Sequence, residues 1–215
     1  IKICKKLLTK THIIIIITTE LINKMIISKK KGVVYMKQKK TTVIFGGSFN
    51  PPLNSHFSIA QEVLNQFEEV EKIVFMPVSQ KYSKDGLIEN EHRYNMLKLI
   101  ADKNSRFMIS DLDFYGEESL TTIEILKGIR KQFPENEICF LMGSDNLKDL
   151  HNWNRPEEIV SKYKILVMER DEDDIDEIIK NDRLLRCYKE NFWKVNQEIK
   201  SNYSSTYVRS QLRKG

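Results

Sequence analysis

Short apolar runs alternate with amphipathic helical stretches along the chain from Lys40 onwards. This alternation is typical of a parallel sheet wrapped by helices, because each helix returns the chain to the starting edge of the sheet. The apolar runs predict strands at residues 42–45, 73–78, 107–112, 137–142 and 165–168, with a last strand at 193–199. Apolar spacing and capping residues predict helices at 55–67, 91–100 and 120–133, a short helix at or after the acidic run 171–176, and another from 204–206. We therefore expect an α/β fold with a Rossmann-like, doubly wound parallel sheet.

Residues 1–35 differ in composition from the rest of the chain. They are rich in lysine and contain the run Ile13 to Ile17, which is much shorter than the roughly 20 apolar residues of a membrane-spanning helix. We therefore expect no membrane anchor, and interpret the segment as an N-terminal extension that is either a non-native leader or a disordered arm. Met36 is a candidate alternative start. The length of 215 residues then leaves one catalytic domain over residues 36–215.

Charge and cysteine content exclude several classes of protein. The formal net charge is +5, and part of the excess lies in residues 2–40, so a general nucleic-acid-binding surface is poorly supported. A phosphate-binding cleft needs only a few well-placed Lys or Arg side chains, so it fits the nearly balanced charge of the chain better. The cysteines Cys4, Cys139 and Cys187 are far apart and odd in number, which predicts neither a disulfide framework nor a metal site. A reducing, cytoplasmic location is expected.

Two glycine turns follow predicted strands. Gly46 and Gly47 follow the first strand, and Gly143 follows the strand at 137–142. The carboxyl ends of parallel strands meet at one edge of such a sheet, where ligands bind in a crevice. We expect both turns to face that crevice.

The stretch from Gly46 to His56 carries the strongest chemical signal. Its glycines allow backbone N–H groups to approach a phosphate without a Cβ in the way. With Ser55 as the predicted N-cap, His56 lies in the first turn of a helix, where free amides and the helix dipole favour an anion. A structural turn followed by an ordinary capped helix is the alternative interpretation.

A second group of donors lies near the C-terminus. Ser204, Ser205 and Thr206 open a predicted helix, and Arg209 follows one turn later. Hydroxyl groups, helix N-terminal amides and a fixed cation together offer several donors to phosphate oxygens. The alternative is an ordinary N-capped surface helix.

The stretch from Gly143 to Trp153 could bind a nucleoside. Gly143 allows backbone groups to approach a ribose, Asp145 can accept hydrogen bonds from ribose hydroxyls, and Trp153 offers a flat face to an aromatic ring. Packing of Trp153 in the core is the competing interpretation.

Together these stretches resemble the signatures of the HxGH-type nucleotidyltransferase superfamily, and most closely those of nicotinate (nicotinamide) mononucleotide adenylyltransferases. This sequence differs from the first family signature at two positions: Leu53 replaces the first histidine, and Ser55 replaces a glycine. Only His56 carries over from the histidine pair. The resemblance implies a nucleotidyltransferase-type sheet with a C-terminal helical phosphate-binding motif, and it covers nearly all of the chain after Met36.

The resemblance also implies roles for individual residues. His56 would be the catalytic residue, and Thr122 would contact the pyridine nucleotide. Lys81 or Lys84 is a weaker candidate for a phosphate-binding lysine. The implied ATP-binding residues are Gly46, Gly47, Ser48, Phe49, His56, Gly143, Asp145, Ser204, Ser205, Thr206 and Arg209. The implied mononucleotide-binding residues are Ser48, Phe49, Thr122, Asn146 and Trp153.

The function implied is the joining of ATP and nicotinate mononucleotide to give nicotinate adenine dinucleotide and pyrophosphate. Mg²⁺ would accompany ATP, and no resident metal site is expected. Three alternatives stay open: nicotinamide mononucleotide as the acceptor, another phosphate-bearing acceptor such as phosphopantetheine, or a degenerate ATP-binding regulatory domain. The expected partners are the two small substrates, without nucleic acid or membrane, and a homo-oligomer stays open.

Overall fold

The computed structural model describes residues 39–82, 86–170, 172–196 and 204–214. All of the elements below belong to one compact unit, Lys40–Gly215. The predicted extension at residues 1–35 lies outside the described residues, and so does Lys84. Among the helices that are described, none is long and apolar enough to cross a membrane.

Six strands form a single sheet in the order β3-β2-β1-β4-β5-β6. All five neighbouring pairs are parallel. The strands are β1 (Thr41–Gly47), β2 (Val70–Pro77), β3 (Phe107–Ile109), β4 (Glu137–Gly143), β5 (Lys164–Met168) and β6 (Phe192–Val195). The chain winds outward from β1 in one direction and from β4 in the other, which confirms the predicted doubly wound α/β fold.

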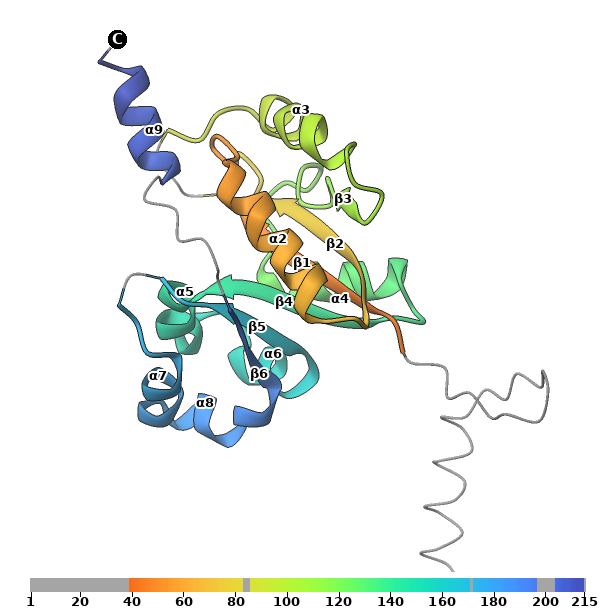
Figure 1. Ribbon diagram of the computed structural model, residues 1–215, viewed down its shortest axis with the longest axis vertical. Coiled ribbons are helices and arrows are strands. Elements are labelled where there is room, and N and C mark those ends of the chain that lie inside the picture. The colour runs from red at the N-terminus through yellow and green to blue at the C-terminus, as the bar shows by residue number, and fades with distance from the viewer. Residues whose placement is uncertain (1–38, 83–85, 171, 197–203, 215) are drawn as a thin grey trace, which may run out of the picture. The chain divides into compact units, whose positions relative to one another are not determined.

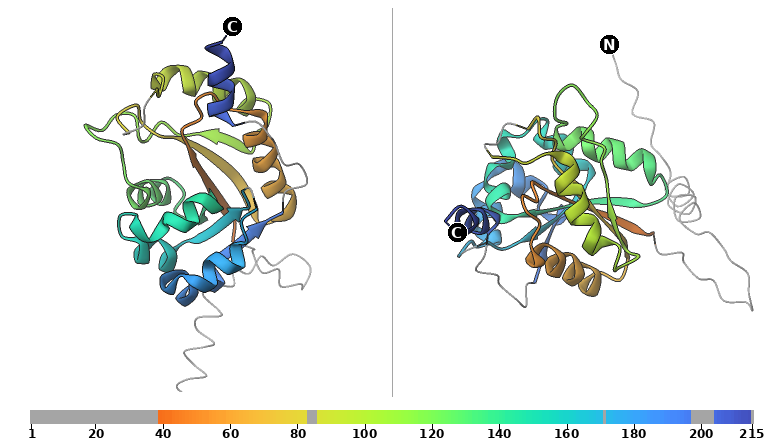
Figure 2. Two further views of the ribbon diagram at one scale, coloured as in Figure 1. Left: turned by 90° about the vertical axis from the view of Figure 1, so that its left-hand side faces the viewer. Right: turned by 90° about the horizontal axis from the view of Figure 1, so that it is seen from above.

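Helices connect the strands and cover the sheet on both sides (Figures 1 and 2). The α-helices are α2 (Asn54–Gln66), α3 (Asn90–Ala101), α4 (Thr122–Gln132), α5 (Ser144–Asp149), α6 (Pro156–Lys162), α7 (Ile175–Asn181), α8 (Arg183–Cys187) and α9 (Ser205–Leu212). Two short 3₁₀ helices are η1 (Leu150–Asn152) and η2 (Lys189–Asn191). As predicted, the acidic run leads into a helix, because the Asp174 carboxylate caps α7.

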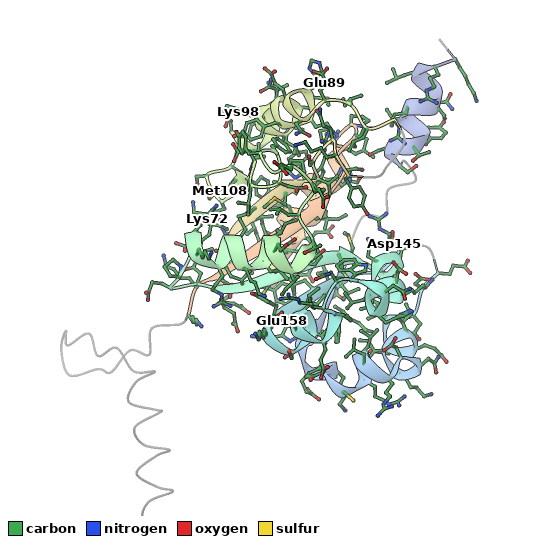
Figure 3. The ribbon with its side chains drawn as sticks, turned by 180° about the vertical axis from the view of Figure 1, so that it is seen from behind. Lys72, Glu89, Lys98, Met108, Asp145 and Glu158 are labelled. Carbon is green, nitrogen blue, oxygen red and sulfur yellow. The ribbon has the colours of Figure 1, made fainter. Side chains whose placement is uncertain are left out.

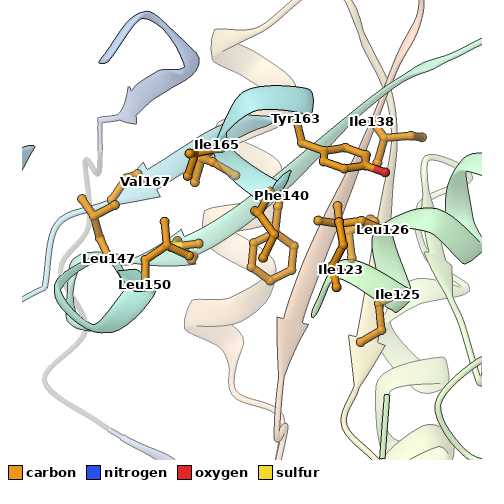
Figure 4. Close-up of a cluster of buried hydrophobic side chains, with 14 of the residues drawn as sticks. Ile123, Ile125, Leu126, Ile138, Phe140, Leu147, Leu150, Tyr163, Ile165 and Val167 are labelled. Atoms are coloured by element: carbon orange, nitrogen blue, oxygen red, sulfur yellow. The ribbon is translucent and has the colours of Figure 1, made fainter. Parts of the chain in front are cut away.

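Alternating side chains of the strands enter two apolar clusters, one on each face of the sheet. In β1, Val43 and Phe45 pack with α2, whereas Ile44 packs on the opposite face with α4. In β4, Phe140 enters the cluster on the α4 side, among Ile123, Leu126 and Leu150 (Figure 4). Burial on both faces explains why these strands have apolar residues without strict alternation.

The structure corrects two predicted strand ranges and adds three helices. The strand predicted at 107–112 ends at Ile109, because the chain turns there and Asp113 points into the protein to accept hydrogen bonds. Helices α5, α6 and α8 were not predicted, since five to seven residues give little periodic signal. The last strand ends at Val195, and residues 197–199 of its predicted range lie outside the described residues.

Candidate active site

The candidate site lies where the strand order reverses, between β1 and β4. The two strands are hydrogen-bonded neighbours, with Phe45 opposite Leu141. Gly46 and Gly47 end β1, and Gly143 ends β4. Both glycine turns therefore lie at one edge of the sheet, as the sequence predicted. In open α/β sheets this switch point is where ligands bind.

The turn after β1 is held by a strained aromatic residue. Phe49 has a φ of 45°, which is uncommon for a residue with a bulky side chain. Its ring is 2% exposed and packs edge-on against Phe45 and against the imidazole of His56, at centroid distances of 5.6 and 5.1 Å. Such conformations persist only where the surroundings impose them. The Phe49 ring therefore fixes both the turn and the neighbouring histidine.

His56 lies in the first turn of α2, but the N-cap is Leu53 and not the predicted Ser55. The helix begins one residue earlier than expected, at Asn54, so Ser55 is helical and cannot cap it. The Leu53 N–H donates to Nδ1 of His56 over 2.8 Å. A neutral imidazole that accepts at Nδ1 carries its proton on Nε2. His56 therefore presents Nε2–H as a donor. Leu53, which stands where the family has its first histidine, contributes only its backbone N–H to this contact.

Burial lowers the pKa of His56 to about 4, and the positive charge of Arg170 contributes to the lowering. His56 is therefore neutral at physiological pH. As a neutral donor it can approach a phosphate without first being protonated.

This pKa predicts a specific loss of stability in acid. Between pH 6.5 and 4 the unfolded chain binds a proton at His56 that the folded chain does not, so the free energy of unfolding falls as pH falls through this window. Urea unfolding at pH 7 and pH 4.5 should show that wild type loses about 2 kcal/mol more than His56→Asn. Equal losses in the two proteins would mean that this imidazole titrates normally.

The N-terminus of α9 rests on the turn that precedes α2 (Figure 1). The Ser205 hydroxyl donates to the Pro51 carbonyl over 2.8 Å, and Nη1 of Arg209 donates to the Asn50 carbonyl over 2.6 Å. Nη2 of Arg209 also donates to the Thr206 hydroxyl over 3.2 Å. Ser204 caps the helix by accepting from the Tyr207 N–H, as expected. The two donor-rich stretches, more than 150 residues apart in sequence, thus meet at one turn.

The turn after β4 contacts a further cation, Arg170, which follows β5 (Lys164–Met168). Gly143 is the N-cap of α5, and the Asp145 carboxylate on α5 (Figure 3) pairs with Nε of Arg170 over 3.2 Å. An ideal Cβ on Gly143 would lie 2.3 Å from the carboxylate and 2.4 Å from Nε, so this ion pair covers the glycine closely. Arg170 also acts electrostatically on His56. Sequence analysis missed Arg170, although its place just after β5 on the same sheet edge was a usable signal.

Of the residues predicted to bind the mononucleotide, Thr122 and Trp153 lie on the α4 side of the sheet, whereas Phe49 packs on the opposite face. Thr122 is the first residue of α4, behind the N-cap Thr121. Trp153 is half-buried and packs edge-on against Phe140 at a centroid distance of 6.1 Å. It thus contributes to the core and keeps part of its ring exposed. Asn146 is exposed on α5.

Lys81, one of the two weaker candidates for a phosphate-binding lysine, already makes a hydrogen bond within the protein. The Lys81 ammonium donates to the Gly116 carbonyl, in the loop after β3. Its role in binding phosphate stays a prediction.

The comparison with protein families decides the classification. The model of the cytidylyltransferase-like family matches residues 44–211, which include both donor-rich stretches. The chain belongs to the cytidylyltransferase-like family. This cytidylyltransferase-like chain is similar to proteins named probable nicotinate-nucleotide adenylyltransferase. The one from Lachnoclostridium phytofermentans is 36% identical over 138 residues, covering 63% of this chain and 68% of the relative. The one from Clostridium tetani is 29% identical over 175 residues, covering 80% and 86%.

Solved structures share the fold of this cytidylyltransferase-like chain. Nicotinic acid mononucleotide adenylyltransferase from Plasmodium falciparum, complexed with NaAD, superposes with a TM-score of 0.66 at 24% identity. The superposition covers 80% of this chain and 83% of that structure. A structure from Vibrio parahaemolyticus, at 20% identity, gives a TM-score of 0.54. These likenesses confirm the predicted nucleotidyltransferase-type fold.

Proposed function

We propose that this chain transfers the adenylyl group of ATP to nicotinate mononucleotide, giving nicotinate adenine dinucleotide and pyrophosphate. The observation that carries the proposal is the docking of Ser205 and Arg209 on the turn that leads to His56. That docking gathers a neutral imidazole donor, a hydroxyl group and a guanidinium at the switch point of the sheet. Names of the relatives described above support the choice of reaction.

The chemistry requires only positioning and charge stabilisation. A phosphate oxygen of the mononucleotide forms a bond to the α-phosphorus of ATP, and the bond from that phosphorus to the bridging oxygen of pyrophosphate breaks. Nε2–H of His56 would donate to the α-phosphate as its charge redistributes. The remaining donors of the Arg209 guanidinium would hold the β- and γ-phosphates, together with the amides at the start of α9, while Ser205 keeps α9 docked on the turn.

Arg170 would add a second cation to this arrangement. Because it already lies close enough to lower the pKa of His56, a phosphate held by His56 would also feel its charge. Its partner Asp145 would then accept from ribose hydroxyls. Mg²⁺ would enter as MgATP, with ligands from phosphate oxygens and water.

An acceptor panel tests the proposal. Purified chain is mixed with MgATP and either nicotinate mononucleotide, nicotinamide mononucleotide or phosphopantetheine, and pyrophosphate release is measured. We expect the highest kcat/KM with nicotinate mononucleotide. A preference for phosphopantetheine would reassign the acceptor. ATP binding without pyrophosphate release from any acceptor would support the degenerate regulatory domain and reject the proposal.

The Trp153 ring is expected to bind the acceptor and not ATP. Trp153→Phe keeps an aromatic ring in the apolar cluster but reduces its face, so the KM for the mononucleotide should rise about tenfold while the KM for ATP changes little. Trp193→Phe is the matched control, because Trp193 stacks on Phe67 and lies under the Lys164 ammonium. An unchanged mononucleotide KM in Trp153→Phe would leave this tryptophan with a packing role only.

A further inference from the structure

Arg93 is a completely buried arginine beside the turn after β1. It lies on α3, and its relative exposure is 0%. Its guanidinium donates to the Ile88 carbonyl over 3.0 Å, the Ser48 carbonyl over 2.9 Å and the Asn90 side-chain oxygen over 2.7 Å. Burying a guanidinium costs free energy unless its donors are satisfied. The three contacts provide that compensation, and one of them is to the turn itself.

A buried carboxylate accompanies this arginine. Asp113 is 1% exposed and acts electrostatically on Arg93 in the direction that raises its pKa, against the larger lowering by burial. Its oxygens accept from the Ser79 N–H over 2.6 Å, from the Ser119 hydroxyl over 2.9 Å and from the Leu120 N–H. The loop after β2 and the start of α4 are thereby tied to the same buried region.

The contact to Ser48 fixes the direction of a peptide group. In a planar trans peptide the C=O and the following N–H point in opposite directions. By holding the Ser48 carbonyl, Arg93 therefore sets the orientation of the Phe49 N–H. Neighbouring carbonyls are also held: Gly47 accepts from the Val78 N–H over 3.0 Å, and Asn50 accepts from Arg209. Arg93 is thus the residue through which α3 holds this turn.

We propose that Arg93 is a positioning residue, which orients the peptide between Ser48 and Phe49 so that its N–H can donate to a phosphate of ATP. The proposal rests on the proposed function for the identity of the ligand. Arg93 acts from behind the turn and touches no substrate. A shift of about 1 Å in such a donor can lower the rate about a hundredfold. Loss of the Arg93 contact should therefore weaken the binding of ATP more than it lowers the stability of the fold.

The test compares Arg93→Lys with Arg106→Lys. Arg106 is the matched control, because its guanidinium also holds backbone carbonyls, those of Val70 and Glu71, but at the opposite end of β2. MgATP affinity is measured by calorimetry without acceptor, thermal unfolding is recorded for all proteins, and amide exchange is followed at residues 48–50 in the ligand-free chain. If Arg93→Lys does not fold, Arg93→Gln, which leaves no buried cation, takes its place.

We expect Arg93→Lys to bind MgATP at least tenfold more weakly than wild type and to exchange the Phe49 amide faster. Arg106→Lys should stay within threefold of wild type in affinity, even where its melting temperature falls equally. Affinity within threefold of wild type in a folded Arg93 variant would overturn the inference, and so would equal loss in both variants. Normal MgATP binding by wild type without turnover of any acceptor would reject the proposed function and leave this inference standing.

Discussion

Replacing His56 with alanine is expected to lower kcat by a factor of about 10² to 10³, the usual effect of removing one preorganised donor from a transition state. The reason is geometric. The Leu53 N–H fixes Nδ1, so the Nε2–H points as a donor from the first turn of α2, and burial keeps the imidazole neutral. Initial rates of pyrophosphate release at saturating MgATP and nicotinate mononucleotide measure the loss. The KM for ATP should change much less than kcat.

His92→Ala is the control for this substitution. His92 is exposed on α3, where its Nε2 lies 4.0 Å from the Glu89 carboxylate. It should retain wild-type turnover. His56→Ala should also remain folded, because it loses one hydrogen bond to Leu53, worth about 1 kcal/mol, and an edge contact with the Phe49 ring, while the rest of the turn keeps its contacts. Turnover of His56→Ala within threefold of wild type would reject the catalytic role.

Replacing Arg209 with alanine should raise the KM for ATP and lower kcat/KM by about a hundredfold. A charge-assisted contact of this kind is worth about 1.5 to 3 kcal/mol, and the same side chain also docks α9 on the turn through the Asn50 carbonyl. Both the lost contact and the weaker docking of α9 would reduce the affinity for the β- and γ-phosphates. The KM for the mononucleotide should change little, because Thr122 and Trp153, two of its expected contacts, lie on the α4 side.

Arg213→Ala is the matched control, since Arg213 is exposed and lies one turn further along, at the C-cap of α9. It should keep a wild-type KM for ATP. Arg209→Lys retains the charge but not the fork of donors, and should fall between alanine and wild type. An unchanged ATP KM in Arg209→Ala would separate the C-terminal stretch from nucleotide binding.

The sheet, and the edge at which its two glycine turns meet, were predictable because they depend on patterns that the sequence displays directly. The apolar runs have strand length, and glycines follow two of them, at Gly46 and Gly143. The hydroxyl residues from Ser204 to Thr206 likewise predicted the start of α9. Local side-chain chemistry decides these features, so a single sequence reveals them.

The polar contacts that shape the site could not be predicted in the same way. Arg93 and Asp113 are buried charges that each hold a group far away in sequence, the Ser48 carbonyl and the Ser79 N–H, and nothing in the local sequence marks a charged residue as buried. Ser55 was the expected N-cap by residue type, but α2 begins behind Leu53, whose side chain offers no acceptor. Here the backbone path through the turn overrides local preference.

A crystal structure of the chain with a non-hydrolysable ATP analogue tests the central claim most directly. The account predicts that one triphosphate lies within hydrogen-bonding distance of both the His56 imidazole and the Arg209 guanidinium. A triphosphate that contacts only one of the two, or that binds away from the turn between β1 and α2, would contradict it.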